Sequence, residues 1–332
     1  MHPSRISLAA AGATIALVGT TLVTATAAPA APRSQAAQHL PRTYTLKPVG
    51  PAADDIFPEG ITVHGKRFFV GSTTDGTIYR GNVARKKAKP FLLGGSDNRT
   101  SVTGMKVSHG RLFIAGAATG RVFAYDLRSR KLVGSWLVAQ TGEPTFLNDI
   151  SVGAHGAIYV TDSLRPVLYR IPVRKQTTDG VKTLRIFKDF TGSPLQYTTG
   201  FNVNGIATSA NGKFLVLAQS NTSTLFRLRI SNRAVTPVNL HGQLVSGDGL
   251  VLRNRTLYAV ERQGDVGYIV KIHLAKKLRA GTVLSRTTHP SFNDPTTAAP
   301  FRKRLLVVNS QFGERSAGVE PGPFTVSNVR AP

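Results

Sequence analysis

Short runs of apolar residues, each bounded by polar or turn-forming residues, recur along most of the chain. The clearest are RFFVGS, RLFIAG, AIYVTDS, FLVLAQS, TLYAVE and LLVVNS. Their length and their β-branched and aromatic side chains are typical of β-strands. Several follow a His-Gly or Asn-Gly pair, in which glycine supplies the positive φ of a tight hairpin. The pattern therefore predicts an all-β protein, and it explains the histidines of these pairs as turn residues.

The runs belong to a repeat of about 45 residues, which is the length of a four-stranded propeller blade. Each repeat has a polar residue, a small or turn residue, an apolar run, a tight turn and two further strands. The second residue of this pattern, the anchor, falls at Gly60, Gly104, Asp149, Gly205, Gly249 and Pro295. One repeat is longer because it contains RKQTTDGVKT, which we expect to be an insertion at a hairpin tip.

Sequences outside the six repeats predict how the ring of blades closes. TYTLKP, at 43–48, precedes the first repeat, and GPFTVSNV, at 322–329, follows the incomplete sixth one. A last blade that combined N- and C-terminal strands would use both segments and hide their edges. We therefore predict a six-bladed β-propeller over residues 43–332, closed in this way.

The first residues have the layout of a secretory signal peptide. A single arginine near the start is followed by an apolar region and by small residues around Ala27 and Ala30. This layout predicts a signal peptide over 1–27, with cleavage after Ala27 or Ala30, and a flexible linker over 28–42. An uncleaved membrane anchor is the alternative. With cleavage, the mature chain has no transmembrane segment and is secreted or associated with the cell surface.

The chain is strongly basic, with 42 Lys and Arg against 17 Asp and Glu and a formal net charge of +25. This balance favours contact with a polyanion such as an anionic cell-wall polymer, although a solvated surface without a partner remains the alternative. We expect no specific nucleic-acid binding, because no recognition helix, zinc finger or RNA-binding motif is visible. The absence of cysteine excludes thiolate metal sites and cysteine catalysis.

The residue before each anchor is polar and carries oxygen in all six repeats. These residues are Glu59, Thr103, Asn148, Asn204, Asp248 and Asp294. Equivalent positions of a propeller form a ring, and close carboxylates repel each other unless a cation neutralises them. Oxygen ligands without His or Cys favour calcium over zinc. The ring therefore predicts one divalent cation, although a set of hydrogen-bonded turns that start the strands would show the same residues.

Four motifs resemble the six-bladed propellers of the SMP-30/gluconolactonase/luciferin-regenerating-enzyme family. They are PEGI at 58–61, LNDISV at 147–152, VNGIATSANGK at 203–213 and GDGLVL at 247–252. The resemblance covers roughly 45–328. It implies that Glu59, Asn204 and Asp248 bind the metal, and that Asn148 reaches the metal or the substrate. It also implies that Asp248 is the catalytic base for the attack of water on a lactone.

The resemblance leaves two functions open. The first is a metal-dependent hydrolase of a lactone or ester. The second is a non-catalytic extracellular propeller that binds an anionic cell-wall polymer or a protein partner. Two features that are common in the family's hydrolases, a Gly-Pro after the first glutamate and a nearby tryptophan, are absent, since Glu59-Gly60 continues into Ile61 and the only tryptophan is Trp136. The metal ligands are therefore better retained than the substrate pocket.

Overall fold

The computed structural model describes residues 40–49 and 54–332. The predicted signal peptide (1–27) and most of the predicted linker (28–42) lie outside the described residues, so both stay predictions. Residues 40–42 are described: the backbone oxygens of Pro41 and Arg42 accept hydrogen bonds from Asn328, at 2.7 Å for each.

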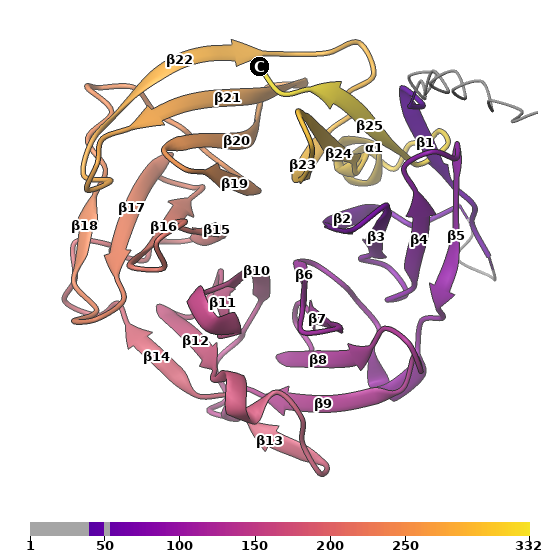
Figure 1. Ribbon diagram of the computed structural model, residues 1–332, viewed down its shortest axis with the longest axis horizontal. Helices are drawn as coiled ribbons and strands as arrows, with labels where there is room; N and C mark the ends of the chain where they lie inside the picture. Colours follow the sequence, from indigo (N-terminus) through magenta and orange to yellow (C-terminus); the bar gives the residue numbers. More distant parts are fainter. Residues whose placement is uncertain (1–39, 50–53) are drawn as a thin grey trace, which may run out of the picture. The chain divides into compact units, whose positions relative to one another are not determined.

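The described residues form five β-sheets that follow one another around a common centre (Figure 1). Three of them are four-stranded and antiparallel. Their strands are β10 (Leu147–Val152), β11 (Ile158–Asp162), β12 (Val167–Ile171) and β14 (Ile186–Asp189); β15 (Val203–Thr208), β16 (Phe214–Gln219), β17 (Thr224–Arg229) and β18 (Val235–Pro237); and β19 (Leu250–Arg253), β20 (Thr256–Gln263), β21 (Val266–Leu274) and β22 (Gly281–Thr287).

A fourth sheet gains a strand from the insertion. Its own strands are β6 (Met105–Ser108), β7 (Arg111–Ala115), β8 (Arg121–Asp126) and β9 (Leu132–Leu137). The inserted segment begins with a 3-10 turn, η3 (Val173–Lys175), and continues as β13 (Val181–Thr183). It leaves the β12–β14 connection and pairs β13 in parallel with β9 of the preceding sheet. The insertion therefore ties two sheets together.

The fifth sheet has eight strands and contains both ends of the described chain. On one side are β2 (Pro58–His64), β3 (Arg67–Ser72), β4 (Ile78–Asn82) and β5 (Lys87–Leu92), and on the other are β1 (Thr43–Leu46), β25 (Thr325–Arg330), β24 (Arg304–Asn309) and β23 (Pro295–Phe301). β1 pairs antiparallel with β25 and in parallel with β5. The predicted pairing of N- and C-terminal strands is thus confirmed.

The hydrophobic core lies between neighbouring sheets. One cluster joins Phe113 and Trp136 to Ile158 and Tyr169 of the next sheet. Another, around Tyr44, joins the two halves of the eight-stranded sheet. Each sheet is thus covered on both faces, which accounts for the nearly continuous apolar runs. Within the described ranges, no helix is long and apolar enough to cross a membrane. The helix α1 (Phe312–Ala317) has six residues.

The strand that comes first in each repeat lies innermost. A cavity of about 290 Å³ is lined by equivalent residues of β2, β6, β10, β15, β19 and β23, so these strands run in the same direction along it. Loops that lead into the innermost strands therefore share one end of the molecule, which we call the ring end. The turns that join first to second and third to fourth strands share the other end, which we call the hairpin end.

Candidate functional site

The four predicted metal ligands all lie at the ring end, where the innermost strands begin. Glu59 is in β2, Asn148 is in β10, Asn204 is in β15, and Asp248 stands two residues before β19. The first three each fall where the pairing register of the innermost strand shifts. Such a bulge re-aims a side chain out of the regular alternation, and bulges are common beside functional sites.

Close backbone contacts bring neighbouring ring positions together. The N–H of Gly104 donates to the carbonyl oxygen of Asn148 at 2.6 Å. The hydroxyl of Thr161 donates to the carbonyl oxygen of Asn204 at 2.8 Å. A Cβ on Gly60 would lie 1.8 Å from the carbonyl oxygen of Thr103. The anchor glycines are therefore explained by crowding at the centre, because the next strand occupies the place of a side chain.

The sixth ring position is Thr296, so the alignment that placed Asp294 there was wrong. The register shift between β23 and β24 spans Thr296, and its carbonyl oxygen accepts from Gly249 N–H at 2.9 Å, as that of Asn148 does from Gly104. Asp294 precedes the strand in a left-handed conformation (φ 52°). Its carboxylate accepts from Arg262 at 2.8 Å and from the backbone N–H of Gly313 at 2.6 Å. Asp294 therefore supports the loop before β23.

Two carboxyl groups of the ring are held in an environment that opposes their ionisation. Burial, followed by the charges of Asp248 and Asp149, raises the pKa of Glu59 well above its usual range. Burial and the charge of Asp149 raise the pKa of Asp248 to about 7, and a hydrogen bond from Asn204 partly offsets this rise. Removal from water and mutual repulsion both disfavour the charged carboxylates. A bound cation would relieve both effects.

Asp149 is a site residue that the sequence reasoning missed. The repeat pattern places it at an anchor position, as a small or turn residue, but its buried carboxylate accepts hydrogen bonds from Ile150 N–H at 2.7 Å and Ile206 N–H at 3.3 Å. Lys106 lies 3.7 Å from it. Its charge acts on both Glu59 and Asp248. The available signal was that it is the only charged residue at an anchor position.

The unoccupied hydrogen-bonding capacity of the ring fits an oxygen-binding cation. Asp248 Oδ1 is buried and has no hydrogen-bond partner among the described residues. The amide nitrogen of Asn148 donates to Ser163 Oγ at 3.0 Å, which leaves its oxygen as the atom for a ligand. In residues 40–49 and 54–332, no three His, Cys, Asp or Glu side chains form a metal cluster. The candidate set is instead two carboxylates and two amides, which are ligands that calcium accepts.

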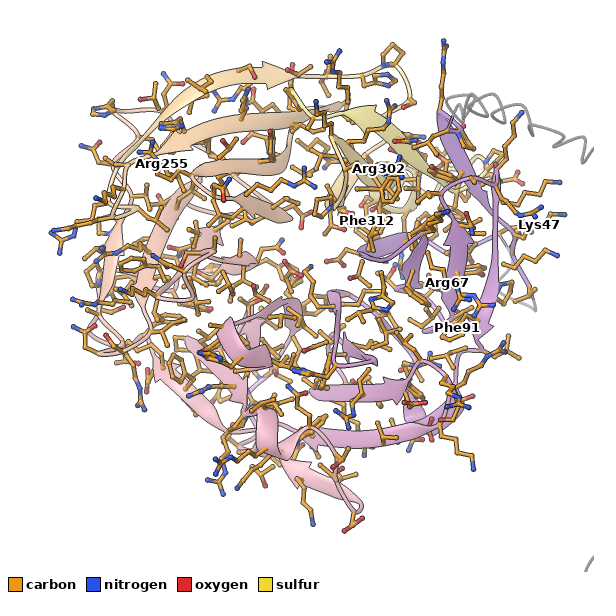
Figure 2. The ribbon with its side chains drawn as sticks, in the orientation of Figure 1. Lys47, Arg67, Phe91, Arg255, Arg302 and Phe312 are labelled. Carbon is orange, nitrogen blue, oxygen red and sulfur yellow. The ribbon has the colours of Figure 1, made fainter. Side chains whose placement is uncertain are left out.

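A small pocket opens beside these residues. It has a volume of about 260 Å³ and is lined by Asn204, Asp248 and Thr296 of the ring, and by Ser220, Ser246, Arg262, Asp294, Pro295 and Phe312. Phe312 belongs to α1 and lies near β23 (Figure 2). The pocket combines an unpaired carboxylate oxygen with hydroxyl groups and the Arg262–Asp294 ion pair. It can therefore hold a small polar molecule against Asp248.

Comparison with known proteins identifies the fold but no family. No protein-family model matches the chain, and no curated protein matches it. Solved structures match it closely in shape. The major allergen Mala s 1 of Malassezia sympodialis is 14% identical with a TM-score of 0.61, and the match covers 88% of this chain and 96% of the allergen. The fold is that of a β-propeller.

Two further propellers match this chain over most of its length. A luciferin-regenerating enzyme is 16% identical with a TM-score of 0.59, covering 82% of this chain and 91% of its own. Virginiamycin B lyase of Staphylococcus aureus is 11% identical with a TM-score of 0.56, covering 89% and 99%. At these identities the similarity shows only the propeller fold. The evidence for a site in this chain comes from its own ring residues and from the two cavities described above.

Proposed function

We propose that the chain is a secreted, six-bladed propeller that hydrolyses a lactone or ester with the help of one bound calcium ion. The blade count takes the eight-stranded sheet as two blades joined through β1 and β5. Glu59, Asn148, Asn204 and Asp248 would hold the ion. The observation that carries the proposal is the buried, unpartnered Oδ1 of Asp248 beside a polar pocket at the ring end.

Asp248 has the properties of a general base. Burial raises its pKa to about 7 in the metal-free chain. A bound cation would lower this pKa and keep the carboxylate ionised, as a general base must be. Oδ1 would accept a proton from water, while the Asn204 amide orients the carboxylate. Ser220, Ser246 and Arg262 would position the substrate in the pocket. The cation, when bound, would supply Lewis-acid polarisation of the substrate carbonyl.

Metal analysis and hydrolysis assays on the same preparations test the proposal. We expect the purified chain to carry one calcium ion and to hydrolyse members of a lactone and aryl-ester panel, with activity lost in chelator. Glu59→Gln should weaken calcium binding. Asp248→Asn should lower kcat/KM by about a hundredfold or more, because a general base contributes about 10²- to 10⁴-fold.

Asp265→Asn is the matched control, since Asp265 is an exposed acid in the β20–β21 turn at the same end. It should leave metal content and kcat/KM unchanged. Absence of metal-dependent turnover across the panel would overturn the hydrolase, and a chain that bound calcium without turnover would be a non-catalytic binding propeller. A chain free of metal at physiological calcium would overturn the metal site itself.

A further inference from the structure

Basic residues that are spread along the sequence gather at one end of the propeller. Each turn of the hairpin end is taken from the last residue of one strand to the first residue of the next. These turns hold 24 basic and two acidic residues. They are 64–67, 82–87, 108–111, 126–132, 152–158, 171–186, 208–214, 229–235, 253–256, 274–281 and 301–304.

The ring end has the opposite balance. Its loops, counted in the same way from the β1–β2 loop to the β24–β25 loop, hold 12 acidic and five basic residues. The molecule is therefore positive at one end and negative at the other. Because the hairpin turns surround a common centre (Figure 1), the positive charge covers a two-dimensional face rather than a single groove. A face of this kind complements a planar anionic surface.

Within residues 40–49 and 54–332, the basic residues of the hairpin end form no ion pairs. The ion pairs among the described residues are Lys106–Asp149, Arg262–Asp294 and Arg286–Glu261, and none involves a hairpin turn. Beside the β4–β5 turn, a cleft of about 270 Å³ is lined by five basic residues and no acidic one: Arg67, Arg80, Arg85, Lys87 and Lys89.

The clustering of like charges in the cleft destabilises the fold locally. Arg80 and Lys89 are directly opposed across two strands, an arrangement of like charges that destabilises a sheet. The guanidinium of Arg80 is held 4.6 Å above the ring of Phe91. Arg67 and Phe91 both lie at the sheet formed by β2–β5 (Figure 2). The cleft can thus receive the phosphate of a larger anionic surface.

Exposed large hydrophobic side chains at the hairpin end are confined to the inserted segment 171–186. They are Val173, Val181 and Ile186, which are 41%, 48% and 57% exposed. Arg174, Lys175, Lys182 and Arg185 lie among them in the sequence. Apolar side chains beside clustered cations suit the interface of an anionic membrane, since both terms contribute to surface binding. A hydrophilic polymer would leave the apolar side chains uncovered.

We propose that the hairpin end docks on an anionic lipid bilayer, with segment 171–186 at the lipid interface and the ring end facing the solution. This inference does not rest on the hydrolase activity. Nucleic acid fits less well, because the exposed large hydrophobic residues described at this end include no aromatic side chain on which a base could stack.

Vesicle binding by charge-matched variants tests the proposal. The chain beginning at Ala28 would be floated with vesicles of phosphatidylcholine, alone or mixed with phosphatidylglycerol, at about 0.15 M salt. The hairpin-end variant is Arg85→Gln/Lys86→Gln/Lys276→Gln/Lys277→Gln. The control reaches the same net charge by adding four acids to exposed threonines at the ring end: Thr100→Glu, Thr141→Glu, Thr222→Glu and Thr288→Glu.

We expect binding to the mixed vesicles only, at least about a tenfold loss in the hairpin-end variant, and a change of less than about twofold in the control. Because the chain has no cysteine, Val181→Cys and Thr222→Cys can each carry an environment-sensitive dye. A blue shift on vesicle binding is expected at 181 and not at 222.

Three results would overturn the proposal. They are absence of binding to mixed vesicles, an equal loss in both four-residue variants, and a blue shift at 222. Preference for soluble polyphosphate or oligonucleotide over vesicles would replace the bilayer with a polymer as the partner.

Discussion

At the scale of single residues, the centre of the propeller is shaped by backbone that leaves no room for side chains. Gly60, Gly205 and Gly249 each face atoms of the next innermost strand, at 1.8, 2.1 and 2.7 Å from where a Cβ would lie. None of these three glycines has a positive φ. Glycine is therefore required here for steric reasons, and not because the backbone conformation demands it.

Replacing one anchor should therefore be costly. Gly60→Ala is expected to lower the free energy of unfolding by about 1–3 kcal/mol, the usual cost of overpacking, because backbone of a neighbouring strand must move. Gly313→Ala is the control, since its nearest neighbours are 3.5 Å away or more. Urea denaturation should show a lower midpoint for Gly60→Ala and an unchanged midpoint for Gly313→Ala. Equal midpoints for all three proteins would contradict the steric explanation.

Asp75 gives a pH-dependent prediction at the same scale. Burial alone would raise its pKa, but hydrogen bonds from Ser72 and Thr77 outweigh burial and lower the pKa. Thr77 donates its backbone N–H at 2.9 Å and its hydroxyl at 2.6 Å. A folded-state pKa below the unfolded value of about 3.9 stabilises the fold above that pH. This contribution disappears as the pH falls through the folded-state pKa.

Asp75→Asn should consequently cost about 1 kcal/mol at pH 7, a modest value because the side chain is partly exposed. The difference from the unmodified protein should shrink towards zero as the pH falls through the folded-state pKa of Asp75. Denaturation at several pH values measures it. A difference that stayed constant down to pH 2 would show that the carboxylate charge plays no part.

The sequence allowed most of the ring to be predicted, because five repeats keep the same spacing between the polar residue and the strand. The sixth failed at Asp294, where an Asp-Pro turn imitates the motif two residues too early. Asp149 was missed for a different reason. Its role depends on Ile206 and Lys106, which come from other sheets, and no local pattern encodes such contacts.

At the scale of elements, Asn328 of β25 secures the closure of the sheet that contains both chain ends. Its amide donates to the carbonyl oxygen of Pro41 at 2.7 Å and to the Tyr44 hydroxyl at 3.1 Å. Its oxygen accepts from Arg304 at 2.5 Å. One side chain thus joins β1, β24 and β25.

Asn328→Ala should lower the free energy of unfolding by about 2–4 kcal/mol, because three hydrogen bonds are lost and buried partners are left unsatisfied. Asn232→Ala, at an exposed turn with one hydrogen bond at 3.2 Å, is the control and should cost less than about 1 kcal/mol. Thermal and urea denaturation compare them. Similar costs for the two variants would show that the closure depends on β-pairing alone.

The inserted segment shows where element prediction ends. The greater length of its repeat predicted an insertion at a hairpin tip, and the segment indeed joins β12 to β14. The sequence did not show that β13 would cross to β9 of the preceding sheet. Parallel pairing between these strands leaves no spacing signal, since β13 is a short exposed strand and the half-buried β9 already pairs with β8.

At the scale of the whole molecule, the segregation of charge predicts an unusual response to salt. The cations of the hairpin end repel each other, and about 0.15 M salt screens this repulsion at distances longer than the Debye length. The melting temperature should therefore rise between low salt and about 0.15 M NaCl, by about 2–4 °C for each kcal/mol of relieved repulsion. Scanning calorimetry of the metal-free chain measures this rise.

The four-residue hairpin-end variant should have a higher melting temperature than the unmodified protein at low salt. Its melting temperature should rise less when salt is added. The ring-end variant of equal net charge should keep the full gain. If the rise in melting temperature with salt were reduced equally in both variants, the net charge of the protein, and not the location of the charges, would cause the salt effect. Linear reading of the sequence hides this segregation, because successive turns alternate between the two ends and so mix the two charge patterns along the chain.

The pairing of β1 with β25 also sets the order of events during synthesis. β1 is made near the start of the chain, while its partners in β25 are nearly 290 residues away, as the Asn328–Pro41 contact shows. At a ribosomal rate of about 5–20 residues per second, β1 waits roughly 15–60 s for its partner. During that interval the edge of β1 can pair with other chains. A chaperone that holds this strand, or export before folding, would therefore determine the yield of native protein.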